Sequence, residues 1–201
     1  HALMNVCHPF FEKVQIFDSY ASRPGKGTYA ALNRAKYFNR HYKWFLKLDF
    51  RKYFDSLDHT VLEKQLKLLF KDAGLLAIFI KIINSYSINQ NKGVPIGNLT
   101  SQYFANHYLA RLDHYVKEIL KTRAYVRYMD DMVLWNDKKE MLLNAGKLLK
   151  QYAETKLQLT LKPFCLNRSR HGLSFLGYIL YPGGIRLAPR NRNDYWWKFG
   201  S

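Results

Sequence analysis

Two adjacent aspartates, Asp130 and Asp131, are the first residues in this sequence whose types and spacing could do chemistry. Apolar, β-prone residues flank them over 124–135, which predicts two short strands joined by the two acids. A two-residue hairpin loop favours Asn-Gly or Asp-Gly, and adjacent carboxylates must be hydrated, paired or bound to a cation. This stretch alone supports a solvated acidic turn and a functional site equally.

A third aspartate, Asp49, stands near the end of an apolar segment over 44–50 that predicts another strand. Asp55 and Asp58 are explained as a turn residue and a helix N-cap, whereas Asp49 has no such structural role. Three carboxylates that meet at one end of a sheet would bind hard divalent cations such as Mg²⁺, which accepts carboxylate and phosphate oxygens. Two such ions serve in-line phosphoryl transfer, in which one of them activates a 3′-hydroxyl.

The elements that must position these acids predict an α+β fold. Strand 44–50 is followed by helices, by the paired strands of 124–135, by an amphipathic helix and by strands at 157–161 and 173–180. This order is typical of a split βαβ antiparallel sheet with helices on one face. In such a sheet the end of the first strand and the acidic turn can be neighbours.

Composition points to a nucleic-acid partner. The chain has 201 residues, 48% of them hydrophobic, which suits one packed domain with at most a small appendage. Aromatic residues make up 16% and offer stacking surfaces. The formal net charge of +17 is spread along the whole chain, and it favours a nucleic acid over charge that serves solubility or attraction to a membrane.

Cysteine usage and hydropathy predict a cytoplasmic protein. Cys7 and Cys165 are far apart and outside any metal-binding spacing, so we expect free thiols in a reducing compartment. The longest apolar stretch, 75–83, is short and contains Lys81, and no signal peptide is visible, so we expect no membrane span. The chain begins at His1 without an initiator Met, as a piece of a longer protein would.

A loop rich in small residues follows the first predicted helix, over 19–28. Gly25 and Gly27 would let backbone amides approach a phosphate, and Arg23 and Lys26 would supply positive charge. The spacing does not match a Walker motif. We favour contact with phosphate or template over an ordinary surface loop, because the chain is so basic.

Several motifs in this order resemble those of reverse transcriptases. Tyr-Met-Asp-Asp at 128–131 is the hallmark of that family, and Phe-Leu-Lys-Leu-Asp at 45–49 with Tyr-Phe-Asp-Ser at 53–56 looks like its first catalytic motif. Phe-Leu-Gly-Tyr at 175–178 resembles the hairpin that grips the primer end, and 19–32 resembles the fingers of bacterial enzymes related to group II introns. The resemblance covers nearly the whole chain and implies an RNA-directed DNA polymerase.

One stretch narrows the resemblance. Most reverse transcriptases have Gln-Gly, three residues and then Ser-Pro at the start of the long palm helix, whereas this chain has Ile96 in place of the Gln and Gln102 in place of the Pro. That pattern is similar to the enzymes of diversity-generating retroelements in bacteria and phages. In that family the enzyme copies a template RNA with frequent errors at adenines, assisted by a small basic accessory protein.

The resemblance also implies a division of the chain. Partial fingers would occupy 1–43, and the palm 44–187, with finger-side helices at about 58–92. The segment 188–201 would begin the thumb or a connection to it. The family's upstream finger motifs would precede His1.

The resemblance assigns roles to individual residues. Asp49, Asp130 and Asp131 would be catalytic and, with the carbonyl of Phe50, would bind two Mg²⁺ ions, for which Mn²⁺ could substitute. Either Lys162 or Cys165 occupies the position of a proposed proton donor to pyrophosphate, and this role stays open. Residues that would line the incoming nucleotide are Phe54, Ile96, Gly97, Ser101 and Gln102. Residues that would contact nucleic acid are Arg23, Lys26, Tyr128 and Met129.

Purely structural interpretations are also open for several of these residues. An aromatic ring at Phe54 would clash with a ribose 2′-hydroxyl and select deoxynucleotides, or it would simply be core. Tyr128 and Met129 would flank the primer terminus, or they would be strand core. The expected partners are template RNA, a DNA or RNA primer and deoxynucleotides. The alternatives are an intron maturase, a retron or defence enzyme, and a non-catalytic RNA-binding module.

Overall fold

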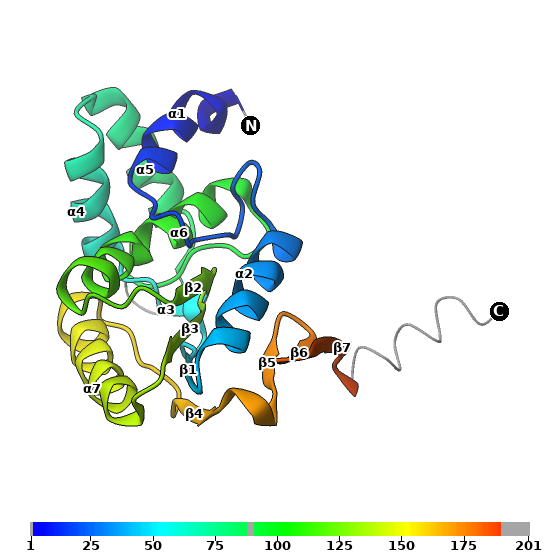
Figure 1. The fold of residues 1–201 in the computed structure, drawn as a ribbon. Helices are drawn as coiled ribbons and strands as arrows, with labels where there is room; N and C mark the ends of the chain where they lie inside the picture. Colours follow the sequence, from blue (N-terminus) through cyan, green and yellow to red (C-terminus); the bar gives the residue numbers. More distant parts are fainter. Residues whose placement is uncertain (1, 88–90, 190–201) are drawn as a thin grey trace.

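A four-stranded antiparallel sheet lies at the centre of the computed structural model, which describes residues 2–87 and 91–189 (Figure 1). The strand order is β2-β3-β1-β4. The strands are β1 (Trp44–Leu48), β2 (Tyr125–Tyr128), β3 (Asp131–Asn136) and β4 (Cys165–Arg168). Leu48 pairs with Met132, so the chain leaves β1 at the end of the sheet where β3 begins.

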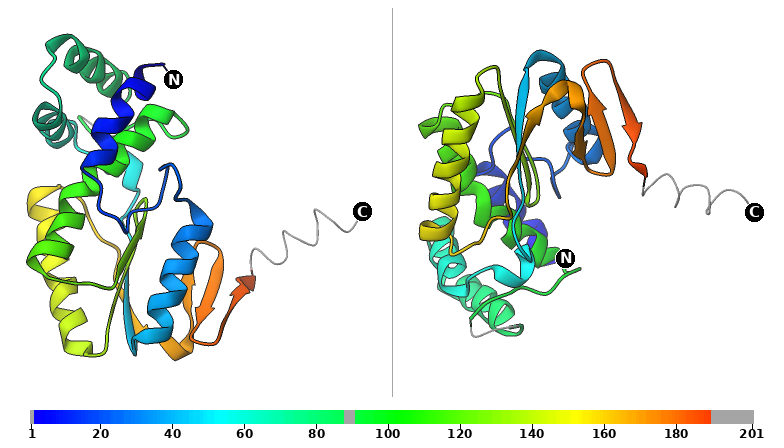
Figure 2. Two further views of the ribbon diagram at one scale, coloured as in Figure 1. Left: turned by 45° about the horizontal axis from the view of Figure 1, so that its top comes forward. Right: turned by 90° about the horizontal axis from the view of Figure 1, so that it is seen from below.

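Helices α6 (Leu99–His114) and α7 (Lys139–Lys156) cover one face of this sheet (Figure 2), and a π-helical turn (Tyr115–Ile119) continues α6. Side chains alternate between the two faces of a strand, so Leu46 and Leu134 point toward these helices. They are fully buried there with the apolar stripe of α7, which includes Leu142 and Leu149. This packing explains the helical periodicity of the α7 sequence.

The second face also carries a helix. Helix α2 (Thr28–His41) packs there together with a three-stranded antiparallel sheet of β5 (Leu173–Phe175), β6 (Tyr178–Tyr181) and β7 (Gly184–Leu187). Phe45, Val133 and Trp135 form the sheet's side of this second core. The predicted α+β class is confirmed, and α2 adds a layer that the prediction of helices on one face left out.

The remaining helices gather beyond the end of the sheet. They are α1 (Ala2–Lys13), the short α3 (Tyr53–Ser56), α4 (His59–Leu69) and α5 (Ala73–Asn84). Phe11, Phe70, Phe79 and Phe104 pack ring against ring and join α1, α4, α5 and α6. Much of the high aromatic content therefore serves the core. In the part of the chain that the structure describes, no helix is long and apolar enough to cross a membrane.

Asp58 caps α4 as predicted, since its carboxylate accepts a hydrogen bond from the Val61 amide at 3.1 Å. The predicted strand at 157–161 is wrong: Gln158 has a φ of 53°, which interrupts an extended run, and only Leu161 forms an isolated bridge. The edge strand beside β1 is β4 instead. The predicted strand at 173–180 is two strands, β5 and β6. Most of the predicted thumb segment, 190–201, lies outside the described residues.

Candidate active site

The acidic turn is shifted by one residue from its predicted position. Tyr128 pairs with Asp131, so Asp131 already belongs to β3 and the two connecting residues are Met129 and Asp130. Met129 has a φ of 54°, while Asp130 does not have a positive φ. This is the pattern of a type II′ turn, whose first residue is normally glycine. A methionine there is strained and needs support from its surroundings.

Arg127 supplies that support from below the turn. Its Nη1 donates a hydrogen bond to the carbonyl oxygen of Met129 at 2.9 Å. The same guanidinium is fully buried and binds the fully buried Asp113 of α6 through contacts of 2.7 to 2.9 Å. Asp113 also accepts a hydrogen bond from Tyr125 at 2.7 Å. Burial opposes the positive charge, but Asp113 outweighs it and raises the pKa of Arg127. A permanent ion pair thus holds the turn.

Asp49 meets the turn through strand register. It follows β1 directly, one step beyond the Leu48–Met132 pair, which places it beside Asp131. Burial raises the pKa of Asp130, and the charges of Asp49 and Asp131 raise it further. Burial also raises the pKa of Asp131, with Asp49 adding to the effect. The three predicted catalytic acids are therefore close enough to repel one another.

Two lysines pair with these acids. Lys47 Nζ lies 2.9 Å from Asp131 Oδ1 and also donates to the carbonyl oxygen of Ser174 in β5 at 3.0 Å. Lys162 Nζ lies 2.5 Å from Asp49 Oδ2, and this hydrogen bond raises the pKa of Lys162. Lys47 is a residue that the sequence analysis missed. Its spacing of two from Asp49 was the available signal, because residues i and i+2 of a strand share a face.

The acids have the donor chemistry of a magnesium site. Carboxylate oxygens are the hard ligands that Mg²⁺ prefers, and a cation would offset both the burial and the mutual repulsion that raise the pKa values of Asp130 and Asp131. Within residues 2–87 and 91–189, no three His, Cys, Asp or Glu side chains are grouped closely enough to hold one ion as they stand. Lys47 and Lys162 neutralise two of the acids in this arrangement.

The predicted nucleotide-lining residues occupy two connected segments. The carbonyl oxygen of Phe54 accepts a hydrogen bond from the Val94 amide at 2.9 Å, which joins α3 to the segment that carries Ile96 and Gly97. Ile96 is 73% exposed, and Gly97 has a φ of 95°, a conformation that favours glycine. Phe54 is half-buried against the core. These contacts place Phe54 beside the segment that precedes α6.

The start of α6 gives a mixed result. Ser101 is buried, with 1% of its surface exposed, so it faces the protein interior. Gln102 Oε1 accepts a hydrogen bond at 2.8 Å from Ser22, a residue of the loop over 19–28. On the other side of the sheet, Thr28 donates to the Tyr128 hydroxyl at 3.2 Å. The loop over 19–28 is thereby hydrogen-bonded both to the start of α6 and to the acidic hairpin.

The cations of that loop turn inward. Arg23 has an 8% exposed side chain, which forms an ion pair with Glu12 at 2.6 Å and donates to the carbonyls of Ile16 and Ser19. Lys26 Nζ lies 3.5 Å from the centre of the Phe17 ring and donates to the Phe17 carbonyl. These contacts indicate that Arg23 stabilises the loop. They do not favour the phosphate contact that the sequence predicted for this residue. Lys26 remains half-exposed.

A comparison with protein-family models settles the family. The model described as "Reverse transcriptase (RNA-dependent DNA polymerase)" matches residues 2–180, which is most of the chain and includes all three acids. The chain belongs to the reverse transcriptase family. Reverse transcriptases as a family use divalent metal ions, which agrees with the donor chemistry of Asp49, Asp130 and Asp131.

The curated relatives of this chain include intron-encoded proteins. The chain is 23% identical to the putative COX1/OXI3 intron 2 protein of Saccharomyces cerevisiae, over 88% of this chain and 28% of that protein. It is 29% identical to the group II intron-encoded protein LtrA of Lactococcus lactis subsp. cremoris, over 58% of this chain and 20% of that protein. The chain thus spans less than a third of the length of these relatives.

Solved structures share the fold. Apo telomerase from Candida tropicalis, truncated from its C-terminal domain, superposes with a TM-score of 0.72 at 13% identity, over 93% of this chain and 45% of that one. A telomerase from Candida albicans, in complex with a TWJ fragment of telomeric RNA, gives a TM-score of 0.64 at 13% identity, over 93% of this chain and 36% of that one. At this identity the likeness concerns the fold alone.

Proposed function

We propose that this chain is the palm and partial fingers of an RNA-directed DNA polymerase that copies an RNA template into cDNA. The observation that carries the proposal is the meeting of Asp49, Asp130 and Asp131 at one end of the central sheet, in a chain of the reverse transcriptase family. Template RNA, a primer and deoxynucleotides are the proposed partners, and the net charge of +17 supports a polyanionic one.

Each part of the site has a task in the proposed reaction. Asp49, Asp130, Asp131 and the carbonyl of Phe50 would hold two Mg²⁺ ions or their Mn²⁺ substitutes. When bound, such ions activate a 3′-hydroxyl and stabilise the charge that develops on the transferred phosphoryl group. Arg127 fixes the backbone of the turn so that the acids need not reorganise. Lys47 and Lys162 pair with two of the carboxylates, Asp131 and Asp49, and help to fix their positions.

Primer extension by the full-length protein tests this proposal. Asp49→Asn removes one charged ligand and is expected to abolish metal-dependent synthesis while the fold survives. Glu140→Gln is the matched control, because it removes one exposed carboxylate from the first turn of α7, which follows the end of β3 remote from Asp131. Substantial synthesis by the Asp49→Asn protein would refute the assignment, and equal loss in the control would show that the assay reports charge alone.

The type of genetic element that encodes this enzyme is a finer proposal. The intron-encoded relatives support a group II intron type of enzyme. The stretch 96–102 supports an error-prone enzyme of a diversity-generating retroelement, with its small basic accessory protein. Ile96 is 73% exposed, so it does not serve the core, and its side chain is free to meet a ligand in either type of enzyme. The error spectrum of the enzyme distinguishes the two types.

A further inference from the structure

A basic pocket lies at the end of the central sheet opposite the acids. Its volume is about 820 Å³, and its walls come from the end of α2, the start of β1, the end of β4 and the 3₁₀ helix Ser169–His171. Asp49 lies five residues beyond Trp44, a lining residue of this pocket, and that span measures about 16 Å along a strand. The charged lining residues are Arg40, Lys43, Arg168 and Arg170, with Asp137 as the one carboxylate.

Internal hydrogen bonds hold the walls of this pocket in place. The buried Asn39 of α2 donates from Nδ2 to the carbonyls of Leu180 at 2.9 Å and Ser169 at 3.4 Å. The Ser169 amide donates to the carbonyl of Lys43 at 2.9 Å. Helix α2, the lead into β1, the 3₁₀ helix and β6 are thereby joined around the cavity. The walls of the pocket are therefore held to one another by hydrogen bonds between elements of the fold.

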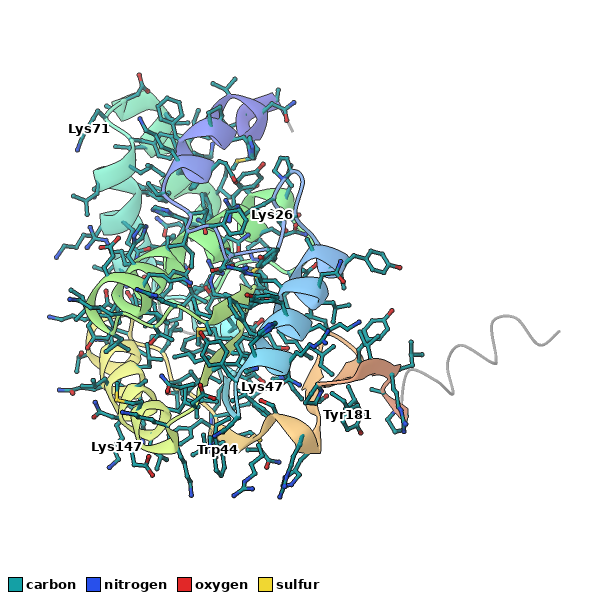
Figure 3. The ribbon with its side chains drawn as sticks, in the orientation of Figure 1. Lys26, Trp44, Lys47, Lys71, Lys147 and Tyr181 are labelled. Atoms are coloured by element: carbon teal, nitrogen blue, oxygen red, sulfur yellow. The ribbon has the colours of Figure 1, made fainter. Side chains whose placement is uncertain are left out.

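Among the described residues the cations of the basic pocket form no ion pairs, although Arg168 lies over the Trp44 ring and Arg170 donates to His171. Arg40, Lys43, Arg168 and Arg170 are exposed and take part in none of the ion pairs within the described ranges, unlike the lysines beside the acids. Trp44 holds two cations over its ring, with Arg168 at 5.0 Å and Lys139 at 5.5 Å from the ring centre (Figure 3 labels Trp44). The Ser169 hydroxyl, 2% exposed, also lacks a hydrogen-bond partner among these residues.

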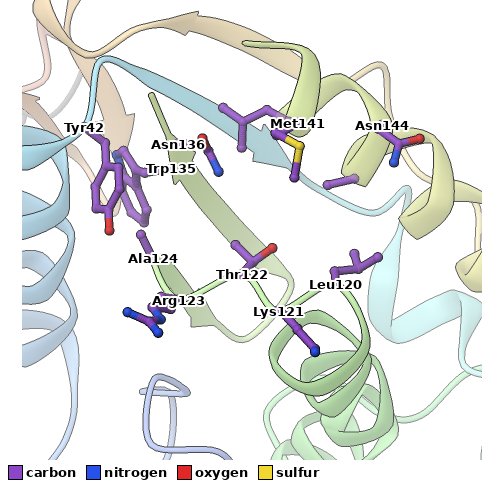
Figure 4. A pocket seen from close by; sticks show the side chains of 12 residues that line it. Tyr42, Leu120, Lys121, Thr122, Arg123, Ala124, Trp135, Asn136, Met141 and Asn144 are labelled. Atoms are coloured by element: carbon purple, nitrogen blue, oxygen red, sulfur yellow. The ribbon is translucent and has the colours of Figure 1, made fainter. Parts of the chain in front are cut away.

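A second pocket extends this surface around the end of the sheet. It has a volume of about 220 Å³ and shares Tyr42 with the basic pocket (Figure 4). Lys121 and Arg123 line it, and both are exposed. Positive charge is therefore presented on both sides of Tyr42, over more than one concavity. A single small anion would leave most of these donors unpaired, whereas a phosphate backbone presents a charge at every step.

We propose that the basic pocket binds the phosphate backbone of the RNA at a place separate from the polymerase site. Guanidinium groups pair with phosphate oxygens through two parallel hydrogen bonds, which suits the three arginines of the pocket. The pocket anchors a part of the RNA that is not being copied. This inference rests on the proposed function only in taking RNA as the ligand.

Binding measurements on the full-length protein without nucleotides test this inference. Arg40→Gln with Arg170→Gln removes two exposed cations from the pocket. Lys147→Gln with Lys156→Gln is the matched control, because it removes two exposed cations from α7. Fluorescence anisotropy follows binding of a long single-stranded RNA and of a short template–primer duplex over a series of salt concentrations. Thermal unfolding of both double variants checks the fold.

The pocket variant is expected to bind the long RNA about tenfold more weakly at moderate salt. The slope of log affinity against log salt is expected to fall by about 2, one for each lost phosphate contact. Binding of the short duplex and its extension should be unchanged. Equal slopes for the pocket variant and the control would overturn the inference. An equal loss of affinity for the long RNA and for the short duplex would overturn it as well. Either result leaves the Asp49→Asn test of polymerase activity intact.

Discussion

Arg127 donates a hydrogen bond to the carbonyl oxygen of Met129 at 2.9 Å, and this single contact links a buried ion pair to the strained turn that carries Asp130. The ion pair with Asp113 is inaccessible to solvent on both sides. The backbone that leads directly into Asp130 is therefore set from within the core, by α6, and not by the turn sequence alone.

This link is tested by variants that separate the contribution of Arg127 to stability from its role in positioning the turn. Arg127→Met is expected to lower the free energy of unfolding by about 3–5 kcal/mol, because it leaves Asp113 buried without its partner. Adding Asp113→Asn keeps an acceptor for the Tyr125 hydroxyl and removes the stranded charge, so most of the stability should return. Primer extension should stay low in the double variant, because the Met129 carbonyl has still lost its donor.

Urea denaturation and primer extension by the full-length protein measure the two effects. Recovery of both stability and the rate of synthesis in the double variant would mean that Arg127 serves the fold only. Recovery of stability alone supports the positioning role.

In the proposed metal site, Lys47 would compete with Mg²⁺ for Asp131. Lys47→Gln is expected to lower the Mg²⁺ concentration for half-maximal synthesis by up to about fivefold, since a partly exposed ion pair is worth up to ~1 kcal/mol. Lys67→Gln is the control, because it breaks a partly exposed pair with Glu63 on α4. Magnesium titration of primer extension is the measurement, and a higher magnesium requirement in the Lys47 variant would contradict the prediction.

His107 makes stability depend on pH. It is buried in α6 with its ring 5.4 Å from that of Phe11, and burial lowers its pKa from 6.5 to about 4. As pH falls below 6.5 the unfolded chain takes up a proton that the folded protein refuses, so stability falls until about pH 4. The loss between pH 7 and pH 5 should be about 2 kcal/mol.

Urea denaturation at the two pH values measures this loss. His107→Leu should remove about this part of the pH dependence, whereas His171→Gln, at an exposed position, should leave it unchanged. An equal pH dependence in the His107 variant and the original protein would contradict the prediction.

A substitution at Ile96 tests which type of genetic element encodes the enzyme. A Gln at this position could hydrogen-bond beside the incoming nucleotide and Ile cannot, and one such contact is worth up to about tenfold in accuracy. Ile96→Gln should therefore lower misincorporation, most visibly opposite template adenine, without destroying synthesis. Ile119→Gln is the control at another exposed isoleucine. Sequencing of cDNA made from a defined RNA decides, and equal error spectra would favour the intron type.

Local signals in the sequence determined much of this protein. The apolar run that ends at Asp49, the strands around Asp130 and the cap at Asp58 depend on residues a few positions apart. The order of strands and helices then predicted the α+β sheet, because antiparallel strands bring their ends together whatever the length of chain between them. The three acids could be named in this way before any geometry was known.

Tertiary structure alone decided how charges are used. Arg40 and Arg170 form no ion pair among the described residues, whereas Arg23 and Arg127, with the same side chain, are paired with Glu12 and Asp113. The cost of burying a charge depends on which partner lies within hydrogen-bonding distance, and that partner belongs to another element of the fold. The sequence gives the number of cations. Only the packing of the fold distinguishes the cations that stabilise the protein from those that remain available for the proposed contact with RNA.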